Sequence, residues 1–214
     1  MKRIAAIMGV VLGLMAFGAQ AAVVYNNGAA AGDSGRCAET SGACGGTWTV
    51  FDDFTLSSAA TITDIKWTVF LTAGLGDYTG ARAWVYSADP VFGSGVLLNT
   101  VVAQLGAPTQ SSLGGNFYDI DLSGLSISLG AGTYWLGMQH DTTSSFAAVA
   151  CTEPCSGHST QWQNNGIGYR LGDNDDNGRK YAFSLESNAV PTPATVALLS
   201  IGLVGIGAAR RKQS

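Results

Sequence analysis

Residues 61–72 read Thr61-Ile-Thr-Asp-Ile65-Lys-Trp67-Thr-Val69-Phe-Leu71-Thr72. Large apolar side chains occupy positions 65, 67, 69 and 71, and polar side chains occupy positions 64, 66 and 68. Successive side chains of a β-strand point to opposite faces of its sheet. A period of two residues over this length therefore predicts a strand with one buried face and one polar face.

Short strand patterns of this kind recur along the middle of the chain. Gly, Ser, Thr and Ala dominate there, Lys and Glu are scarce, and no helical period is present. The other predicted strands are 47–56, 81–87, 96–105, 116–122, 125–129, 133–140, 145–150, 159–163, 168–171 and 179–185. Strands of this length between Gly- and Pro-bearing turns predict an all-β fold, an antiparallel β-sandwich of jelly-roll-like type.

The first 21 residues have the three parts of a secretory signal. Met1-Lys2-Arg3 is positive, residues 4–18 are uncharged and apolar, and Ala19-Gln20-Ala21 has the small-x-small pattern that signal peptidase cleaves. The sequence thus predicts a signal peptide over residues 1–21, with signal peptidase as a partner. The alternative is an N-terminal anchor helix that stays uncut.

A second apolar segment lies near the other end of the sequence. Residues 194–209 carry no charge, and Arg210, Arg211 and Lys212 follow at once. A helix over this segment is about 24 Å long, a little short of the ~30 Å hydrocarbon core, and it can span by local thinning of the bilayer. The basic cluster would stay on the cytoplasmic side, which leaves the domain outside.

This tail resembles the PEP-CTERM sorting signal of Gram-negative bacteria. The matching parts are Pro191-Thr192-Pro193, the Ala-Thr-Val-Ala-Leu-Leu run at 194–199, the glycine-rich apolar segment and the terminal Arg210-Arg211. Thr192 stands where that family usually has Glu. The resemblance implies that residues 190–214 are a sorting segment, handled by an exosortase (a transpeptidase-like membrane enzyme) in bacteria that make extracellular polysaccharide. It also implies transient anchoring in the inner membrane; a plain C-terminal anchor is the alternative.

The stretch from Phe51 to Leu136 is similar to ectodomains found ahead of such tails. They share an Asp-Asp-Phe-Thr-Leu strand, here 52–56, and a Leu-x-Ala-Gly-Thr-Tyr-Trp-Leu strand, here 129–136. These ectodomains have no established common activity. The resemblance therefore supports the sandwich and implies nothing about mechanism.

The predicted ectodomain, residues 22–189, is strongly acidic. It holds all fifteen acidic residues of the chain and only six basic ones, which gives a formal charge of −9. A surface of this sign repels phosphate backbones and argues against DNA or RNA as a partner.

The four cysteines lie in two local pairs, Cys37 with Cys44 and Cys151 with Cys155. In an exported protein the expectation is two disulfides, and the short loops favour the local pairing among the three that four cysteines allow. A zinc site that combines cysteines with His158 is the alternative, which export disfavours.

Residues 173–178, Asp-Asn-Asp-Asp-Asn-Gly, match the first half of a calcium loop. Asp173, Asp175 and Asn177 are the candidate ligands, because oxygen-bearing side chains at alternate positions of a tight turn converge on a hard cation. The twelfth position is Ser184 rather than Glu, and a strand pattern follows, which excludes an EF-hand. The alternative is a polar hairpin tip, with Asn-Gly as its turn, that joins the last two predicted strands.

No catalytic arrangement stands out. His140-Asp141 precedes Ser144 and Ser145 without a nucleophile elbow, and adjacent strand residues point to opposite faces. Carboxylate pairs for glycoside hydrolysis can be drawn from positions 52, 53, 119 and 121, but such pairs arise by chance in so acidic a domain. We expect no enzyme activity, and a secreted hydrolase is the weakest hypothesis.

Two tryptophans are the candidates for a binding role. Trp135 lies on the strand face opposite Tyr134 and Leu136, and Trp162 sits in the polar run Gln-Trp-Gln-Asn-Asn. An exposed Trp beside amide and carboxylate groups can stack on a sugar ring while its neighbours bond the hydroxyls. In the competing interpretation both tryptophans fill the core of the sandwich.

The sequence as a whole predicts an exported protein of the cell surface or extracellular matrix, sorted by an exosortase-type enzyme and without catalytic activity. The alternative hypothesis is a module that binds extracellular polysaccharide through Trp135 and Trp162, with calcium as an assisting ion. No other cofactor is predicted.

Overall fold

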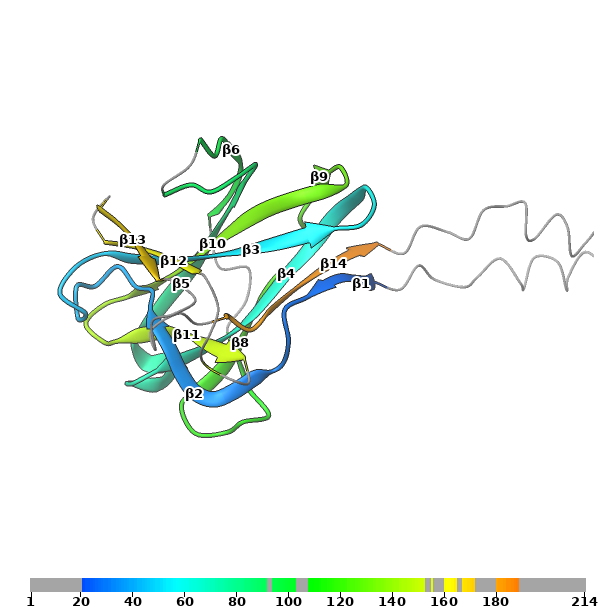
Figure 1. Cartoon of the computed structure of the whole chain (residues 1–214). Helices are drawn as coiled ribbons and strands as arrows, with labels where there is room; N and C mark the ends of the chain where they lie inside the picture. Colours follow the sequence, from blue (N-terminus) through cyan, green and yellow to red (C-terminus); the bar gives the residue numbers. More distant parts are fainter. Residues whose placement is uncertain are drawn as a thin grey trace, which may run out of the picture. The chain divides into compact units, whose positions relative to one another are not determined.

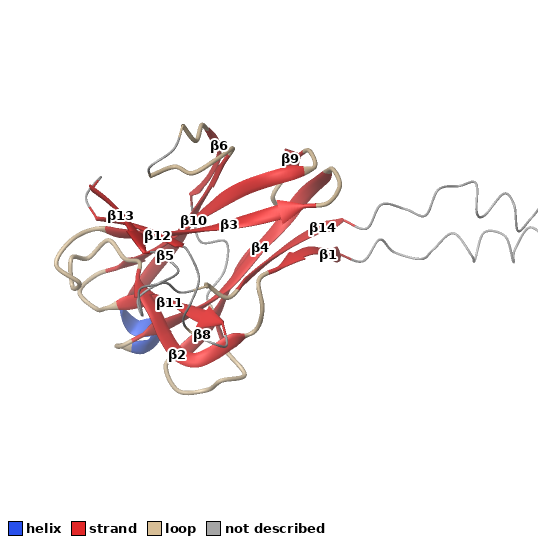
Figure 2. Ribbon diagram, viewed as in Figure 1, coloured by secondary structure: helices blue, strands red, loops and turns tan. Residues whose placement is uncertain are grey.

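The computed structural model describes residues 21–91, 94–102, 108–152, 155, 160–164, 167–171 and 180–188. These residues form two antiparallel β-sheets and one short 3-10 helix, η1 (Gly74–Asp77), as Figure 2 shows. The predicted all-β class is confirmed, and two sheets around one core agree with a β-sandwich. The predicted signal peptide, apart from Ala21, and the predicted sorting segment lie outside the described residues.

One sheet has eight strands. Figure 1 shows the course of the chain through the strands, coloured along the sequence. The eight strands are β1 (Ala21–Asn26), β2 (Ala30–Cys37), β4 (Ala60–Leu71), β7 (Thr109–Gln110), β8 (Phe117–Leu122), β9 (Ile127–Leu129), β11 (Ala147–Thr152) and β14 (Phe183–Asn188). The long strand β4 is the centre: β9 and β8 share one of its edges, and β14 and β11 share the other. β1 lies beside β14, β2 beside β11, and β7 beside β8.

The other sheet has six strands. They are β3 (Trp48–Leu56), β5 (Tyr78–Tyr86), β6 (Leu97–Val102), β10 (Gly132–Thr142), β12 (Thr160–Asn164) and β13 (Ile167–Leu171). Their order is β13-β12-β3-β10-β5-β6, so the long strands β3 and β10 lie in the middle and β6 lies at one edge.

A single hydrophobic core lies between the sheets. On β4 the side chains at 65, 67, 69 and 71 are at most 3% exposed, so the alternation over residues 61–72 identifies the buried face correctly. Alternate residues of β3 and β10 meet them from the six-stranded sheet, among them Val50, Phe54, Leu136 and Met138. Burial of this apolar surface is the main stabilising contribution to the fold.

The last two strands do not form the predicted hairpin. β13 pairs with β12 in the six-stranded sheet, whereas β14 pairs with β4 in the eight-stranded sheet. Residues 180–182 run along β11, where the Ala182 N–H donates to the Ala150 carbonyl at 3.0 Å. On this path Tyr181, Phe183 and Leu185 are all buried in the core. That burial favours the pairing of β14 with β4 over a hairpin with β13.

Both expected disulfides are present, Cys37–Cys44 and Cys151–Cys155. The local pairing predicted from the sequence is therefore confirmed. Each bond ties a short loop to β2 or β11, which are neighbours in the eight-stranded sheet. No helix in the described part of the chain is both long and apolar enough to cross a membrane.

Candidate functional site

The carboxyl group of Asp52 on β3 lies in the core and is 0% exposed. Its Oδ2 accepts hydrogen bonds from the Asn27 side-chain amide at 2.7 Å and from the Tyr181 backbone N–H at 3.0 Å, and its Oδ1 accepts one from the Asp53 N–H at 3.0 Å. Burial raises the pKa of Asp52 to about 8, while these hydrogen bonds act in the opposite direction. Because Asn27 and Tyr181 border β1 and β14, Asp52 connects the two sheets.

His140 on β10 is a second buried polar group, also 0% exposed. Its Nδ1 lies 2.7 Å from the Ala38 carbonyl, and its Nε2 lies 2.8 Å from Nε1 of Trp67 on β4. A carbonyl only accepts and an indole N–H only donates, so the ring is neutral with its proton on Nδ1. Burial lowers the pKa of His140 to about 4, which keeps the ring in this form at neutral pH.

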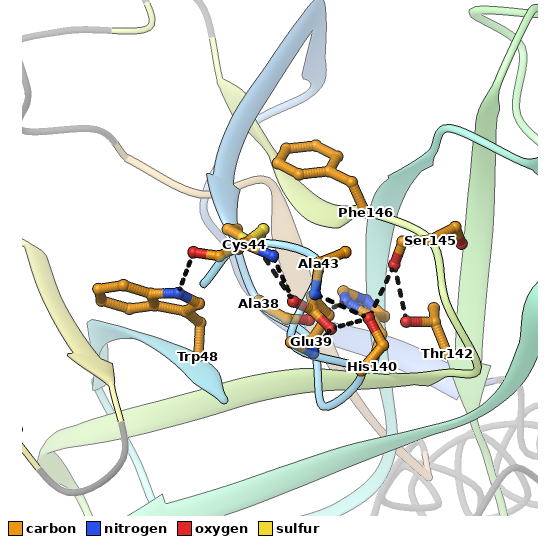
Figure 3. The surroundings of a disulfide bond; sticks show 12 residues. Ala38, Glu39, Ala43, Cys44, Trp48, His140, Thr142, Ser145 and Phe146 are labelled. Atoms are coloured by element: carbon orange, nitrogen blue, oxygen red, sulfur yellow. Dashed lines mark hydrogen bonds between the residues drawn. A yellow bond between two sulfur atoms is a disulfide. The ribbon is translucent and has the colours of Figure 1, made fainter. Parts of the chain in front are cut away.

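Glu39 is the third buried polar group, and Figure 3 shows its carboxylate facing Cys44. The carboxylate accepts hydrogen bonds from the backbone N–H groups of Gly42 and Cys44, both at 3.0 Å, and from the Ser41 hydroxyl. Cys37, Glu39 and Cys44 are close enough together to hold a metal ion, but the disulfide leaves neither cysteine a thiolate to offer. Glu39 therefore organises the disulfide loop.

The residues considered for a hydrolase do not assemble into one. His140 points into the core, where both ring nitrogens are engaged, whereas Asp141 lies on the opposite face of β10 with its Oδ2 accepting from Arg82 Nε at 3.0 Å. The Ser144 N–H donates to the Asp77 carboxylate at 3.0 Å. His140 is therefore not placed to act as the base for Ser144 or Ser145.

The four aspartates considered for glycoside hydrolysis do not gather at one place, although Asp119 and Asp121 lie together on β8. Asp52 is in the core, and Asp53, next to it in the strand, points out of the six-stranded sheet. Asp119 and Asp121 lie on the outer face of the eight-stranded sheet, where Asp121 is 3.6 Å from Lys66 Nζ.

A groove of about 410 Å³ lies on that outer face of the eight-stranded sheet. Its floor is formed by β4, β8 and β14, and the turn at 26–30 borders it. The outward side chains in the described part of its wall are polar, and they include Lys66, Thr68, Asp119, Asp121 and Ser184. The groove offers hydrogen bonds and charge, but its two aromatic lining residues, Trp67 and Phe183, are turned into the core.

The outer face of the six-stranded sheet carries a group of aromatic side chains, which we call the aromatic face: Phe51, Trp84, Tyr86 and Trp135. Strand β5 has an inverted pattern, in which small residues at 81, 83 and 85 are buried in the core and the large ones at 84 and 86 point outward. Tyr86 pairs with Trp135 across the strands, and the rings of Phe51 and Tyr86 meet edge-on with centroids 6.0 Å apart. Trp84, Tyr86 and Trp135 are half-buried, whereas Phe51 is buried beneath its neighbours at 3% exposure.

Gly137 lies in the middle of the aromatic face. It pairs with Phe51 on one side and with Trp84 on the other. A Cβ atom at this position would lie 2.7 Å from Phe51 Cε1 and 3.3 Å from Trp84 Cε3. The two rings therefore lie over the glycine, and a larger residue would push them apart.

Polar groups border the aromatic face at both ends of its strands. At one end Gln139 Nε2 donates to Thr49 Oγ1 at 3.0 Å, next to the ion pair of Arg82 and Asp141. At the other end Asp53 pairs with Trp135 across the strands. Rings flanked by hydrogen-bonding groups match a ligand that is partly apolar and partly hydroxylated.

The two predicted tryptophans lie on different strands of the six-stranded sheet. Trp135 is opposite Asp53 on the outer face of the six-stranded sheet. Position 162 on β12 is opposite Val50, whose side chain is 0% exposed and lies in the core. Trp135 has Trp84 and Tyr86 as its aromatic neighbours on the adjacent strand β5.

Sequence reasoning identified one of the four residues of the aromatic face as functional. A signal for two others exists in residues 81–86, Ala-Arg-Ala-Trp-Val-Tyr, where small and large side chains alternate. The usual assumption that the larger apolar residues fill the core assigns the faces of this strand the wrong way round. In the structure the alanines point into the core and the large residues point outward.

The remaining predicted site residues lie outside the described residues. These are the calcium candidates Asp173, Asp175 and Asn177 and the sorting-motif residues Pro191, Thr192, Pro193, Arg210 and Arg211. Comparison with known proteins adds no assignment, since no protein-family model and no curated protein matches the chain.

Proposed function

We propose that this chain is an exported, non-catalytic protein of the cell surface or extracellular matrix that binds extracellular polysaccharide through its aromatic face. The observation that carries the proposal is the inverted pattern of β5. This strand places Trp84 and Tyr86 outside beside Trp135, while Ala81 and Ala83 fill the core. Large apolar groups gathered on an outer surface are a common mark of a binding site.

The chemistry of the aromatic face fits a pyranose polymer. The C–H face of a sugar ring stacks on an aromatic ring, and the hydroxyl groups at its edge can bond the partly exposed ion pair of Arg82 and Asp141. The domain carries a formal charge of −9, which repels polyanions, so the proposed ligand is an uncharged polysaccharide.

The proposed absence of catalysis is supported by the state of the buried titratable groups. His140 is held neutral between Ala38 and Trp67, and Asp52 is enclosed by Asn27 and the Tyr181 N–H. Each side chain makes hydrogen bonds that connect the two sheets, and each is 0% exposed to solvent.

Export and sorting are part of the same proposal. Two disulfides in short loops suit an oxidising compartment, and the ends of the sequence have the order of a signal peptide and a PEP-CTERM-like segment. We propose a jelly-roll-like sandwich between these two processed ends. Mass spectrometry of protein recovered from the cell envelope or medium checks exosortase cleavage, and recovery of peptides from 198–211 still attached to the chain would contradict it.

Isothermal titration of the full chain with the exopolysaccharide of the producing bacterium tests the aromatic face. Wild type should bind saturably, and Trp84→Ala or Trp135→Ala should raise Kd at least about tenfold, as expected for loss of an aromatic anchor. Phe117→Ala is the matched control, because Phe117 is a half-buried aromatic residue on the outer face of the other sheet. The same titration with and without calcium shows whether calcium, for which Asp173 and Asp175 are the candidate ligands, increases the affinity for the polysaccharide.

The same experiment separates the aromatic face from the groove. Loss of binding in Asp119→Ala together with unchanged binding in Trp84→Ala would place the polysaccharide in the groove and refute the proposed site. If wild type gives no saturable heat, the polysaccharide is not its ligand, and only the proposed role as a surface protein remains.

A further inference from the structure

Strand β6 leaves an apolar edge on the six-stranded sheet. It pairs with β5 on one side, and within the described residues no strand pairs with its other side. Val96, Leu97 and Leu98 at its start are 64%, 47% and 45% exposed, which makes them the most exposed run of large hydrophobic residues in the described chain. Exposed sheet edges are normally guarded by Lys, Pro or inward charges, because unpaired backbone groups attract another chain.

A β-bulge explains why two successive leucines face solvent. Tyr86 of β5 pairs with Leu97, whereas the preceding Val85 pairs with Asn99, so Leu98 is an extra residue on β6. The extra residue breaks the strict alternation, and Leu97 and Leu98 are both turned outward. A bulge can protect an edge, but this one presents leucine instead of a charged residue or proline.

The charge distribution singles out the same edge. No charged residue occurs between Asp89 and Asp119, although the domain as a whole carries a formal charge of −9. Two copies repel each other through most of their acidic surface, but strand β6 itself carries no charged side chain, so pairing along it places no like charges directly opposite each other. A basic partner, in contrast, would be drawn to the acidic faces and away from this edge.

We propose that two copies of this chain associate along β6, with the segment Val96–Leu98 of each copy packed against the other. A two-fold axis perpendicular to the sheet at this edge makes the contact self-complementary. Leu97 lies across the strands from Tyr86, so the interface continues the aromatic face.

The dimer would also strengthen polysaccharide binding. This effect on binding rests on the proposed function, whereas the association of two copies does not. The perpendicular two-fold axis leaves the aromatic faces of both copies on the same side of the joined sheet. One polysaccharide chain can then engage both, and the second contact is intramolecular, which raises the overall affinity without a new type of contact.

Sedimentation velocity of the full chain over a range of concentrations tests the association. Wild type should show a monomer–dimer equilibrium, and L97K/L98K should raise its Kd at least about tenfold, because apolar contacts are lost and like charges are introduced in both copies. Leu113→Lys is the matched control: Leu113 is 39% exposed and lies in the same uncharged stretch, but away from β6. The dimer should tighten from about 10 mM to about 150 mM salt, as the Debye length falls from about 30 Å to about 8 Å.

Two results would overturn the proposal. One is a wild-type chain that sediments as a monomer throughout. The other is an L97K/L98K variant that is folded, as judged by its thermal melt, and associates as tightly as wild type, which would assign the contact to another segment. A dimer that persists in Trp84→Ala while polysaccharide binding fails in wild type would refute the proposed function and leave the association intact.

Discussion

Replacement of His140 by glutamine probes the neutral imidazole at the centre of the core. Glutamine keeps an N–H donor for the Ala38 carbonyl and an oxygen acceptor for the Trp67 indole N–H, and it does not titrate. The variant should fold, with a loss of about 1–2 kcal/mol at pH 7 from imperfect packing.

The pH dependence of this difference follows from the pKa of His140. Burial holds the pKa of the folded ring at about 4, whereas the unfolded ring has the ordinary histidine pKa of 6.5. Between these values only the unfolded chain binds the proton, so the contribution of His140 to stability is complete above pH 6.5 and is lost as the pH falls to about 4. At about 1.4 kcal/mol per pH unit, the loss between pH 7 and pH 4.5 is about 2.5 kcal/mol.

Asp52 acts in the opposite sense and masks this effect in wild type. Burial raises its pKa from 3.8 to about 8, so its contribution is complete below pH 3.8 and is lost as the pH rises to about 8. Between pH 4.5 and pH 6 the His140 contribution to the free energy of unfolding rises with pH about as fast as the Asp52 contribution falls. The stability of wild type should therefore be almost constant over this range. Asp52 is present in both proteins, so the difference between them isolates His140.

Guanidinium titrations followed by tryptophan fluorescence at pH 7, 6, 5 and 4.5 measure that difference. The free energy of unfolding of wild type relative to His140→Gln should fall by about 2.5 kcal/mol from pH 7 to pH 4.5. A difference that stays constant over this range would show that the ring is not held neutral, and it would refute the assignment of its proton to Nδ1.

Three further changes test single contacts, each by chemical denaturation. Gly137→Ala should cost about 1–3 kcal/mol, because the new Cβ would lie 2.7 Å from Phe51 Cε1, whereas Gly76→Ala, with no atom within 4 Å, should be nearly neutral. Cys37→Ser opens a short loop and should cost about 2–3 kcal/mol, and an unchanged midpoint would exclude a stabilising disulfide. Asp52→Ala should cost at least about 3 kcal/mol and remove the fall in stability of about 1.5 kcal/mol expected for wild type from pH 6.5 to pH 8.

The sequence predicts best where one physical signal dominates. Over residues 61–72 the side chains alternate without interruption, and β4 follows with the expected face buried. The cysteine pairing is predictable for a similar reason, since short loops bring Cys37 to Cys44 and Cys151 to Cys155. Strand β2, with the sequence Ala-Ala-Gly-Asp-Ser-Gly-Arg-Cys, has no such signal and is ordered by its pairing with β11.

Features that depend on long-range register could not be predicted. The face on which Trp162 falls depends on the pairing of β12 with β3, and a shift of one residue would reverse it. The burial of Asp52 depends on Asn27 and Tyr181, which are 25 and 129 residues away in sequence. No local pattern distinguishes this carboxyl group from that of its exposed neighbours in an acidic domain.

In the inverted pattern of β5, the small inward residues and the large outward residues need separate explanations. The small inward residues are explained by the core: Ala81 pairs with His140, and its small side chain leaves room for the Trp67 indole that bonds the imidazole. The large outward residues are not explained in this way, because serine, threonine or lysine at positions 84 and 86 would leave the core unchanged. Trp84 and Tyr86 are half-buried, and the contact of the Tyr86 ring with Phe51 adds to the stability of the sheet. The apolar surface that they still expose favours selection for binding at the aromatic face.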